Sequence, residues 1–254
     1  MATISQSEST DWDQPRFVGE PRTTYVIASQ PRCGSHYLAS LLRSTGQAGV
    51  PLEYFNTGHW KRWAHRCGQY NPGAAFRLLR EHRTTPNGVF GVKAHWRQFQ
   101  MACRLRLESE FRDARFVLIT RRDLLGQSIS LAIARQTGAW VSAHQPQRPP
   151  EFSLRAIEIA MRQVLSERDD WERFFAVTGI EPLRLVYEDL LADRDGSMTA
   201  VCGHLGLTWA GGRSSLDVGI QRNELSEEWR RRYREMGRGL MVVETNGDLT
   251  QELL

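Results

Sequence analysis

The chain has 254 residues, of which 41% are apolar and 24% charged, and its formal net charge is +4. These values are typical of a globular protein with a sizeable core, and so small a positive charge does not favour nucleic-acid binding. No segment approaches the roughly 20 apolar residues that cross a bilayer, so we expect a cytoplasmic protein without membrane insertion. The four cysteines are scattered without a C-x-x-C pair, which argues against a disulfide framework and against a metal site.

A strand, a glycine-containing loop and a helix follow one another near the start of the chain. Residues 25–28 predict a short buried strand and residues 37–43 a helix, and Arg32, Gly34 and Ser35 lie between them. Loop N–H groups and the first turn of a helix together bind phosphate or sulfate. The Walker pattern G-x-x-x-x-G-K-[ST] is absent, because no lysine follows Gly34, and this argues against ATP or GTP hydrolysis.

Two further polar residues accompany apolar segments. Glu53 lies between a proline and two aromatic residues, and apolar neighbours can raise the pKa of an acid towards that of a general base. Most loop glutamates are solvated, so this pattern leaves both interpretations open. Lys93 ends a second expected strand, residues 89–93, where a lysine would face the ligand-binding crevice of a parallel sheet.

The rest of the chain contains further expected strands and helices. Buried strands are expected over residues 115–120 and 182–187. Helices are expected over residues 73–83, 99–111, 124–134, 152–178, 198–205 and 226–236. In the helix over 152–178, the near-helical spacing predicts a core-facing side formed by Ile157, Met161, Val164, Leu165, Trp171, Phe174 and Phe175. Residues 1–20 are polar and predict a flexible leader, so that residues 21–254 form a single domain.

Four ordered motifs resemble those of the bacterial Stf0 family of sulfotransferases, which use 3′-phosphoadenosine 5′-phosphosulfate (PAPS). Residues 29–35 resemble the family loop S-Q-R-S-G-S, and residues 85–96 resemble T-P-N-G-V-W-G-x-K-x-M-W with His95 in the Met position. Residues 121–130 resemble R-P-D-x-x-x-Q-A-x-S, and residues 226–233 resemble S-x-E-W-x-x-R-Y. The resemblance implies an α/β, three-layer, P-loop-like fold with a central parallel sheet flanked by helices.

The resemblance also implies an activity. A sulfuryl group would pass in line from PAPS to a hydroxyl of a carbohydrate or glycoside-like small molecule, with adenosine 3′,5′-bisphosphate as product and no metal. The family suggests a sugar such as trehalose or a glycolipid glycan as acceptor. A secondary metabolite stays open, because Val50 and His95 depart from the family pattern on the expected acceptor side. Cap segments near residues 56–83 and 138–150 would cover that acceptor, and a homodimer is expected by analogy with the family.

The resemblance assigns the donor site to three segments. The 5′-phosphosulfate would lie on the first loop, and the ribose 3′-phosphate between Arg121 and Ser130, with Arg122 as the alternative arginine. Arg222 would either close over the nucleotide or cap a solvated helix. The loop residues expected to bind the donor are Gln30, Pro31, Arg32, Cys33, Gly34, Ser35 and His36.

Two residues are candidates for the catalytic base. Glu53 falls on the second glutamate of the family motif G-E-P-Q-E-F-F, which is the family's proposed base. His95 creates a K-x-H pattern like that of eukaryotic cytosolic sulfotransferases, although a buried, hydrogen-bonded histidine is the alternative interpretation. We expect Glu53 to act as the base, with His95 as the second candidate and with Lys93 and Arg32 stabilising negative charge.

Two other functions remain as alternatives. A nucleotide-dependent small-molecule kinase would need a Walker lysine and a carboxylate for magnesium, and the sequence offers neither. A non-catalytic nucleotide-binding module would retain its whole function after Glu53→Ala or His95→Ala.

Overall fold

The computed structural model describes residues 10–68, 71–140, 146–211 and 224–245, with only the backbone described for 237–245. The chain divides into two compact units. The first, here called the sheet unit, consists of residues 1–122 and 164–217. The second, here called the helical unit, consists of residues 123–163 and 218–254. The predicted division into a leader and one domain stays a prediction.

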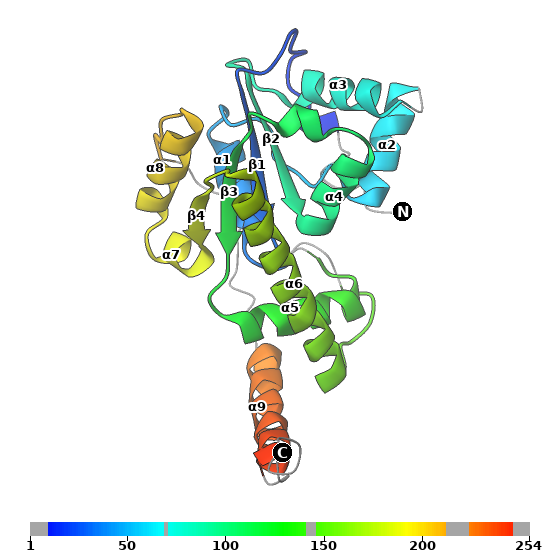
Figure 1. Cartoon of the computed structure of the whole chain (residues 1–254), viewed down its shortest axis with the longest axis vertical. Coiled ribbons are helices and arrows are strands. Elements are labelled where there is room, and N and C mark those ends of the chain that lie inside the picture. Colours follow the sequence, from blue (N-terminus) through cyan, green and yellow to red (C-terminus); the bar gives the residue numbers. More distant parts are fainter. Residues whose placement is uncertain (1–9, 69–70, 141–145, 212–223, 246–254) are drawn as a thin grey trace, which may run out of the picture. The chain divides into compact units, whose positions relative to one another are not determined.

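The sheet unit is built on four parallel strands in the order β2-β1-β3-β4 (Figure 1). The strands are β1 (Thr23–Ser29), β2 (Val89–His95), β3 (Arg115–Thr120) and β4 (Leu183–Val186). β1 is buried from Tyr25 to Ser29 because it lies in the middle of the sheet and both its faces are covered. Continuous apolar runs are typical of parallel strands in this position.

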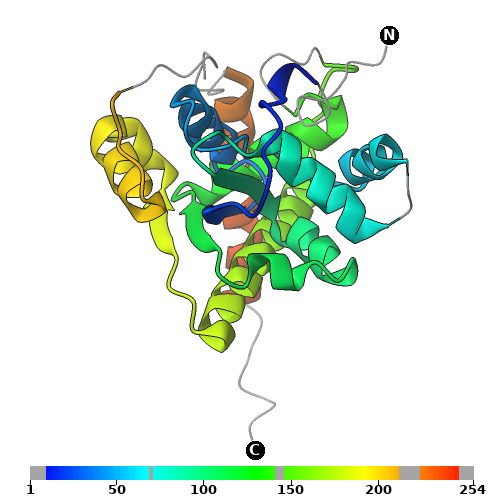
Figure 2. The ribbon, with the colours of Figure 1, turned by 90° about the horizontal axis from the view of Figure 1, so that it is seen from above.

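Helices cover both faces of this sheet (Figure 2). Alternate residues of its strands belong to the core clusters on opposite faces. Val26 and Ala28 belong to one core cluster, and Tyr25 and Ile27 to the other. The first layer contains α2 (Thr57–Cys67), α3 (Pro72–Arg83), α4 (Trp96–Arg104) and the C-terminal part of α6 (Leu154–Thr178). The second contains α1 (Ser35–Ser44), α7 (Tyr187–Ala192) and α8 (Arg194–Leu205). The predicted three-layer α/β fold is therefore confirmed.

The helical unit consists of α5 (Leu124–Thr137), the N-terminal part of α6 and α9 (Glu224–Thr245). Asp123 caps α5 by accepting a hydrogen bond from the Gly126 N–H at 3.0 Å. The same carboxylate pairs with Arg230 of α9 at 2.7 Å. One short acidic side chain therefore fixes the start of α5 and its contact with α9.

Two details differ from the sequence-based expectations. The helix predicted over residues 99–111 is two elements, because α4 ends at Arg104 and a 3₁₀ turn, η2, spans Glu108–Phe111. Arg106 between them has φ 57°, a left-handed conformation that cannot continue a right-handed helix. Leu165, predicted in the apolar face of α6, is 39% exposed.

Residues 10–20 make specific contacts with α2 and α3. The segment begins with a 3₁₀ turn, η1 (Thr10–Trp12), and Asp13 pairs with Arg66 of α2 and with Arg83 of α3. The predicted flexible leader over residues 1–20 stays a prediction, because residues 1–9 lie outside the described residues. Within the described residues, no helix combines the length and the apolar character that crossing a bilayer requires.

Candidate active site

The loop that connects β1 to α1 has the backbone of an anion-binding turn. Arg32 and Gly34 have φ values of 64° and 91°, so two residues of this short loop are left-handed. Gly34 is the N-cap of α1 and offers no side chain to its first turn, which begins at Ser35. Left-handed residues in such a turn aim successive N–H groups towards one point, and the helix dipole favours an anion there.

Two polar side chains of this loop are buried. Gln30 is 1% exposed, and its Nε2 has no hydrogen-bond partner among the described residues. Ser35 is 2% exposed. A buried amide donor without an acceptor costs about 1–3 kcal/mol, and an oxygen of a bound anion would remove that cost. The loop residues therefore fit a phosphosulfate group.

Tyr187 and Arg121 support the loop. A Cβ added to Gly34 would lie 2.1 Å from Cδ2 of Tyr187, so only glycine fits against this ring. The Arg121 guanidinium lies 5.6 Å from the centre of the same ring and donates a hydrogen bond to the Arg32 carbonyl at 3.4 Å. Burial lowers the pKa of Arg32, and the charge of Arg121 lowers it further. The positive charges of Arg32 and Arg121 repel each other, and a bound anion would compensate this repulsion.

A short stretch of β pairing places Glu53 beside the sheet. Leu52 forms a parallel bridge with Val92 of β2, and the Lys93 N–H donates to the Leu52 carbonyl at 3.0 Å. Leu52 is buried in the core, so the following residue, Glu53, faces the carboxyl ends of β1 and β2.

Among the described residues, four side chains contact the Glu53 carboxylate. Lys93 forms a short ion pair with Oε1, and Gln98 donates to Oε2 at 2.7 Å. His36 Nε2 lies 3.3 Å and His95 Nε2 lies 3.5 Å from Oε1. Because His36 belongs to the first turn of α1, the anion-binding loop and Glu53 form one site within the sheet unit.

The charge of Lys93 determines the protonation of Glu53. Burial alone would raise the pKa of Glu53, but Lys93, His95 and His36 together lower it well below the usual range. Burial lowers the pKa of Lys93, and Glu53 counteracts part of this effect. Glu53 is therefore ionised at neutral pH. This corrects the expectation that its apolar sequence neighbours raise its pKa.

His95 is a hydrogen-bonded histidine whose side chain is 15% exposed. Its Nδ1 lies 2.9 Å from the Ser29 hydroxyl, and the Ser29 carbonyl accepts a hydrogen bond from the indole of Trp171 at 3.1 Å. Burial lowers the pKa of His95 to about 4 despite the attraction of Glu53. The ring is therefore neutral at neutral pH, and its Nε2 faces the Glu53 carboxylate.

The two candidate arginines for the 3′-phosphate have different environments. Arg122 is exposed and forms a two-pronged ion pair with Asp189 at 2.7 and 2.9 Å. Arg121 lies against the anion-binding loop. Ser130 lies in α5 of the helical unit and is half-buried, and its pairing with Arg121 stays a prediction. Arg222 lies outside the described residues.

Sequence reasoning missed several contacts of this site. The most important of these contacts is Gln98, which donates a hydrogen bond to Glu53. The sequence signal that could have found it is a capping box: His95 is the N-cap residue of α4, and Gln98 follows it by three residues. His59 of α2 was also missed, and its Nδ1 lies 2.8 Å from the Glu53 carbonyl. No pattern in the sequence marked Ser29 as a partner of His95 or Trp171 as a partner of Ser29.

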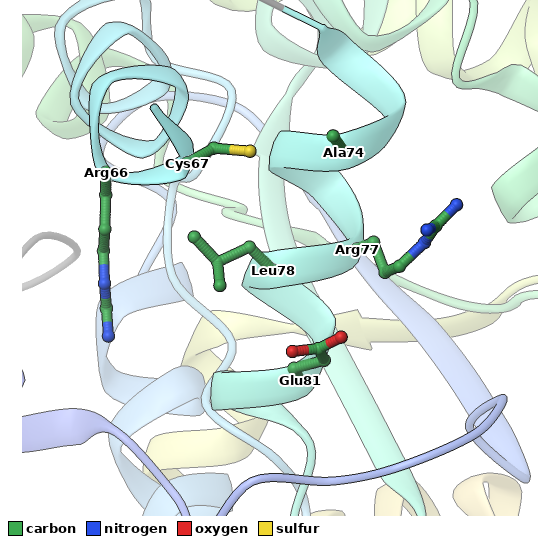
Figure 3. A pocket seen from close by; sticks show the side chains of 6 residues that line it. All are labelled: Arg66, Cys67, Ala74, Arg77, Leu78 and Glu81. Atoms are coloured by element: carbon green, nitrogen blue, oxygen red, sulfur yellow. The ribbon is translucent and has the colours of Figure 1, made fainter. Parts of the chain in front are cut away.

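A separate surface depression lies between α2 and α3 (Figure 3). The Cys67 side chain points from α2 towards α3, and Arg66 is already paired with Asp13. The lining residues are Arg66, Cys67, Ala74, Arg77, Leu78 and Glu81. None of them contacts Glu53, so this depression is not part of the candidate active site.

Residues 24–236 match the model of the family described as Stf0 sulphotransferase, which is more than half of the chain. This chain belongs to the Stf0 sulphotransferase family. It is a transferase of sulfur-containing groups, and the function expected from its sequence motifs is confirmed at this level. The loop and Glu53 described above lie within the matched residues.

Two curated relatives resemble this sulfotransferase over most of their length. The trehalose 2-sulfotransferase of Mycobacterium tuberculosis strain Erdman is 29% identical over 251 residues, which cover 83% of this chain and 94% of the relative. That of Mycolicibacterium smegmatis is 24% identical over 253 residues, covering 84% and 94%. Among solved structures, the sulfotransferase domain of the Synechococcus PCC 7002 olefin synthase has a TM-score of 0.47 and 17% identity, and the match covers 85% of this chain and 90% of that domain.

Proposed function

We propose that this sulfotransferase moves a sulfuryl group from PAPS to a hydroxyl of a carbohydrate or glycoside-like small molecule. The observation that carries this proposal is one site that joins an anion-binding loop to an ionised carboxylate. His36, in the first turn after the loop, lies 3.3 Å from Glu53. The group that would hold the donor and the group that would activate the acceptor are therefore adjacent.

In this proposal the loop holds the 5′-phosphosulfate of the donor. The backbone N–H groups from Arg32 to His36 and the Ser35 hydroxyl would donate hydrogen bonds to its oxygens, and Arg32 would neutralise its charge. The buried Nε2 of Gln30 supports this role, because an anion oxygen would supply its missing acceptor. Arg121 and Ser130 would hold the 3′-phosphate, and Arg121 is favoured over the exposed Arg122 because it contacts the anion-binding loop through the Arg32 carbonyl.

Glu53 is the proposed general base. The acceptor hydroxyl would give its proton to the Glu53 carboxylate while its oxygen forms a bond to sulfur. The bond between sulfur and the 5′-phosphate oxygen would break, and adenosine 3′,5′-bisphosphate would leave. Glu53 is preferred to His95, because both ring nitrogens of His95 already face protein groups: Nδ1 lies 2.9 Å from the Ser29 hydroxyl and Nε2 lies 3.5 Å from Glu53 itself.

Lys93 has two proposed partners during the reaction. It is fully buried and paired with Glu53, so it keeps the carboxylate charged but weakly basic. A donor sulfuryl group would attract the Lys93 ammonium and draw it away from Glu53. The pKa of Glu53 would then rise, and Lys93 would stabilise negative charge on the transferring group.

Trehalose is the first acceptor to test. The two curated relatives are named trehalose 2-sulfotransferases, and they support a sugar hydroxyl as acceptor. Val50, which replaces a family glutamate, is only 2% exposed and lies in the core. The substitution therefore removes a carboxylate from this position without placing another side chain on the acceptor.

The test is transfer of labelled sulfuryl from PAPS to trehalose, followed by mass spectrometry of the product. We expect transfer by the wild type, a loss of about 10²- to 10⁴-fold in kcat for Glu53→Gln, and a smaller loss for His95→Gln. Wild-type rates in Glu53→Gln would contradict the base assignment. Transfer to other glycosides but not to trehalose would change the acceptor and leave the reaction class intact.

A further inference from the structure

Gln98 contacts the site through both ends of its side-chain amide. Its Nε2 donates to Glu53 Oε2 at 2.7 Å, and its Oε1 accepts a hydrogen bond from the His95 backbone N–H at 3.0 Å. Glu53 and Gln98 are 45 residues apart, and the amide is half-buried at the first turn of α4. A single side chain therefore joins the carboxylate to the end of β2.

The chemistry of the two partners fixes the orientation of this amide. The His95 N–H can only donate, so it must face the amide oxygen. The ionised Glu53 carboxylate can only accept, so it must face the amide nitrogen. Turning the amide over would place two donors together and two acceptors together, and both hydrogen bonds would be lost.

The two oxygens of Glu53 consequently have different surroundings. Oε2 is held by Gln98, whereas Lys93, His36 and His95 all lie on the side of Oε1. The ion pair with Lys93 is the contact that changes if the ammonium moves to the donor. A carboxylate held only through Oε1 would then lose its main fixed contact at the moment of reaction.

We propose that Gln98 is a positioning residue that holds Oε2 of Glu53 and so presents Oε1 to the acceptor hydroxyl. This inference deepens the proposed function and rests on Glu53 as the base. Gln98 makes no contact with substrate in this role. It acts by keeping the carboxylate in one orientation, and a misplacement of a catalytic group by about 1 Å can cost about 10²-fold in rate.

Gln98→Glu separates this role from a purely structural one. A glutamate at this position can still accept a hydrogen bond from the backbone N–H of His95, as glutamate commonly does in a capping box. The start of α4 is therefore preserved. The new glutamate cannot donate to Glu53, and it places a second negative charge against the carboxylate. Gln98→Leu has a similar size and removes both hydrogen bonds. Gln100→Leu is the matched control, because Gln100 is exposed on the same helix.

The first readout is the pH profile of kcat with PAPS and trehalose. For Gln98→Glu and Gln98→Leu we expect kcat to fall by about 10- to 100-fold with little change in the KM for PAPS. The acid limb should move to higher pH, because the ionised form of Glu53 loses a donor. Gln100→Leu should match the wild type. Wild-type kcat and an unmoved acid limb in Gln98→Glu would overturn the proposal.

The second readout does not depend on turnover. The pKa of Glu53 is measured by carbon-13 NMR of protein labelled in glutamate side-chain carboxyls, with Glu53→Gln to assign the signal. Lys93, His36 and His95 face the same carboxylate and are unchanged in both variants. We expect a higher pKa in both Gln98 variants, and an unchanged pKa would overturn the proposal. If the wild type neither binds adenosine 3′,5′-bisphosphate nor transfers sulfuryl, the proposed function fails while this titration still tests the hydrogen bond.

Discussion

At the scale of single residues, the ion pair between Glu53 and Lys93 would restrain Glu53 in its proposed role as the base. The Glu53 side chain is 15% exposed, and the ammonium of Lys93 compensates its charge. A base with a depressed pKa reacts slowly, which suits an enzyme that should not deprotonate water or solvent before its donor arrives. The pairing of Glu53 with Lys93 therefore links the proposed activation of the acceptor to the presence of the donor.

His95 gives a pH-dependent prediction at this scale. Its pKa is about 4 in the folded protein, whereas an unperturbed imidazole has a pKa of about 6.5. Between these values the unfolded chain binds a proton that the folded chain does not, so stability falls as pH is lowered through this window. The full effect is about 3 kcal/mol at about 1.4 kcal/mol per pKa unit.

Urea unfolding at pH 7 and pH 4.5 measures this contribution. The loss of unfolding free energy between the two pH values should be smaller in His95→Gln than in the wild type, by about 2 kcal/mol. The exposed His65 on α2 supplies the control, and His65→Gln should behave like the wild type. An equal loss in all three proteins would show that His95 is not a buried neutral histidine.

The partners of Glu53 could not be predicted from neighbouring residues. Its apolar sequence neighbours indicated a raised pKa, but Lys93, 40 residues away, lowers it. This contact depends on the backbone bridge between Leu52 and Val92, which no local pattern reveals. The resemblance to the Stf0 family did group Glu53, Lys93 and His95 in one site, and the last two lie at the carboxyl end of β2.

At the scale of elements, the loop between β1 and α1 depends on one glycine. Gly34 has φ 91°, and an added Cβ would overlap the Tyr187 ring. Gly46 also has a positive φ, 65°, but an added Cβ there would meet no atom within 4 Å. Alanine at Gly46 would therefore introduce backbone strain alone, whereas alanine at Gly34 would introduce both backbone strain and steric overlap.

Gly34→Ala should destabilise the protein by more than about 2 kcal/mol, because strain and overlap add, and it should abolish nucleotide binding. Gly46→Ala should cost only about 1 kcal/mol and leave nucleotide binding intact. Thermal unfolding and calorimetry measure the two effects. Equal destabilisation by both substitutions would contradict the close contact between Gly34 and Tyr187.

The segment before β1 provides a second prediction for elements. Asp13 is 19% exposed at its side chain and pairs with Arg83, which is fully buried, whereas Glu20 is 77% exposed and pairs with Arg80. Removing a carboxylate partner from a buried guanidinium costs about 3 kcal/mol, and an exposed pair contributes less than about 1 kcal/mol. Asp13→Asn should therefore lower the urea midpoint clearly, and Glu20→Gln should hardly change it.

A lower midpoint for Glu20→Gln than for Asp13→Asn would contradict the anchoring of this segment at Asp13. The polar composition of residues 1–20 gave no sign of these contacts. Their partners on α2 and α3 are arginines far along the chain, and composition alone cannot distinguish a solvated arginine from a buried one.

At the scale of the whole molecule, the sequence predicted the order of strands and helices well, but it did not predict where the helix after β2 is interrupted. Four apolar runs predicted the four strands, because buried parallel strands are the most hydrophobic segments of an α/β protein. The break after α4 was missed, because the left-handed residue is Arg106 and not a glycine or an asparagine. The continuous helix α6 carries no sequence signal at the boundary between the two compact units.

The most direct test of the central claim is a calorimetric titration of the purified protein with adenosine 3′,5′-bisphosphate and, separately, with ATP and Mg²⁺. We expect tight binding of the bisphosphate, lost in Arg121→Ala and Ser130→Ala and retained in Arg122→Ala, whose side chain pairs with Asp189. Binding of ATP without binding of the bisphosphate would contradict the assignment of PAPS as donor and would favour a kinase.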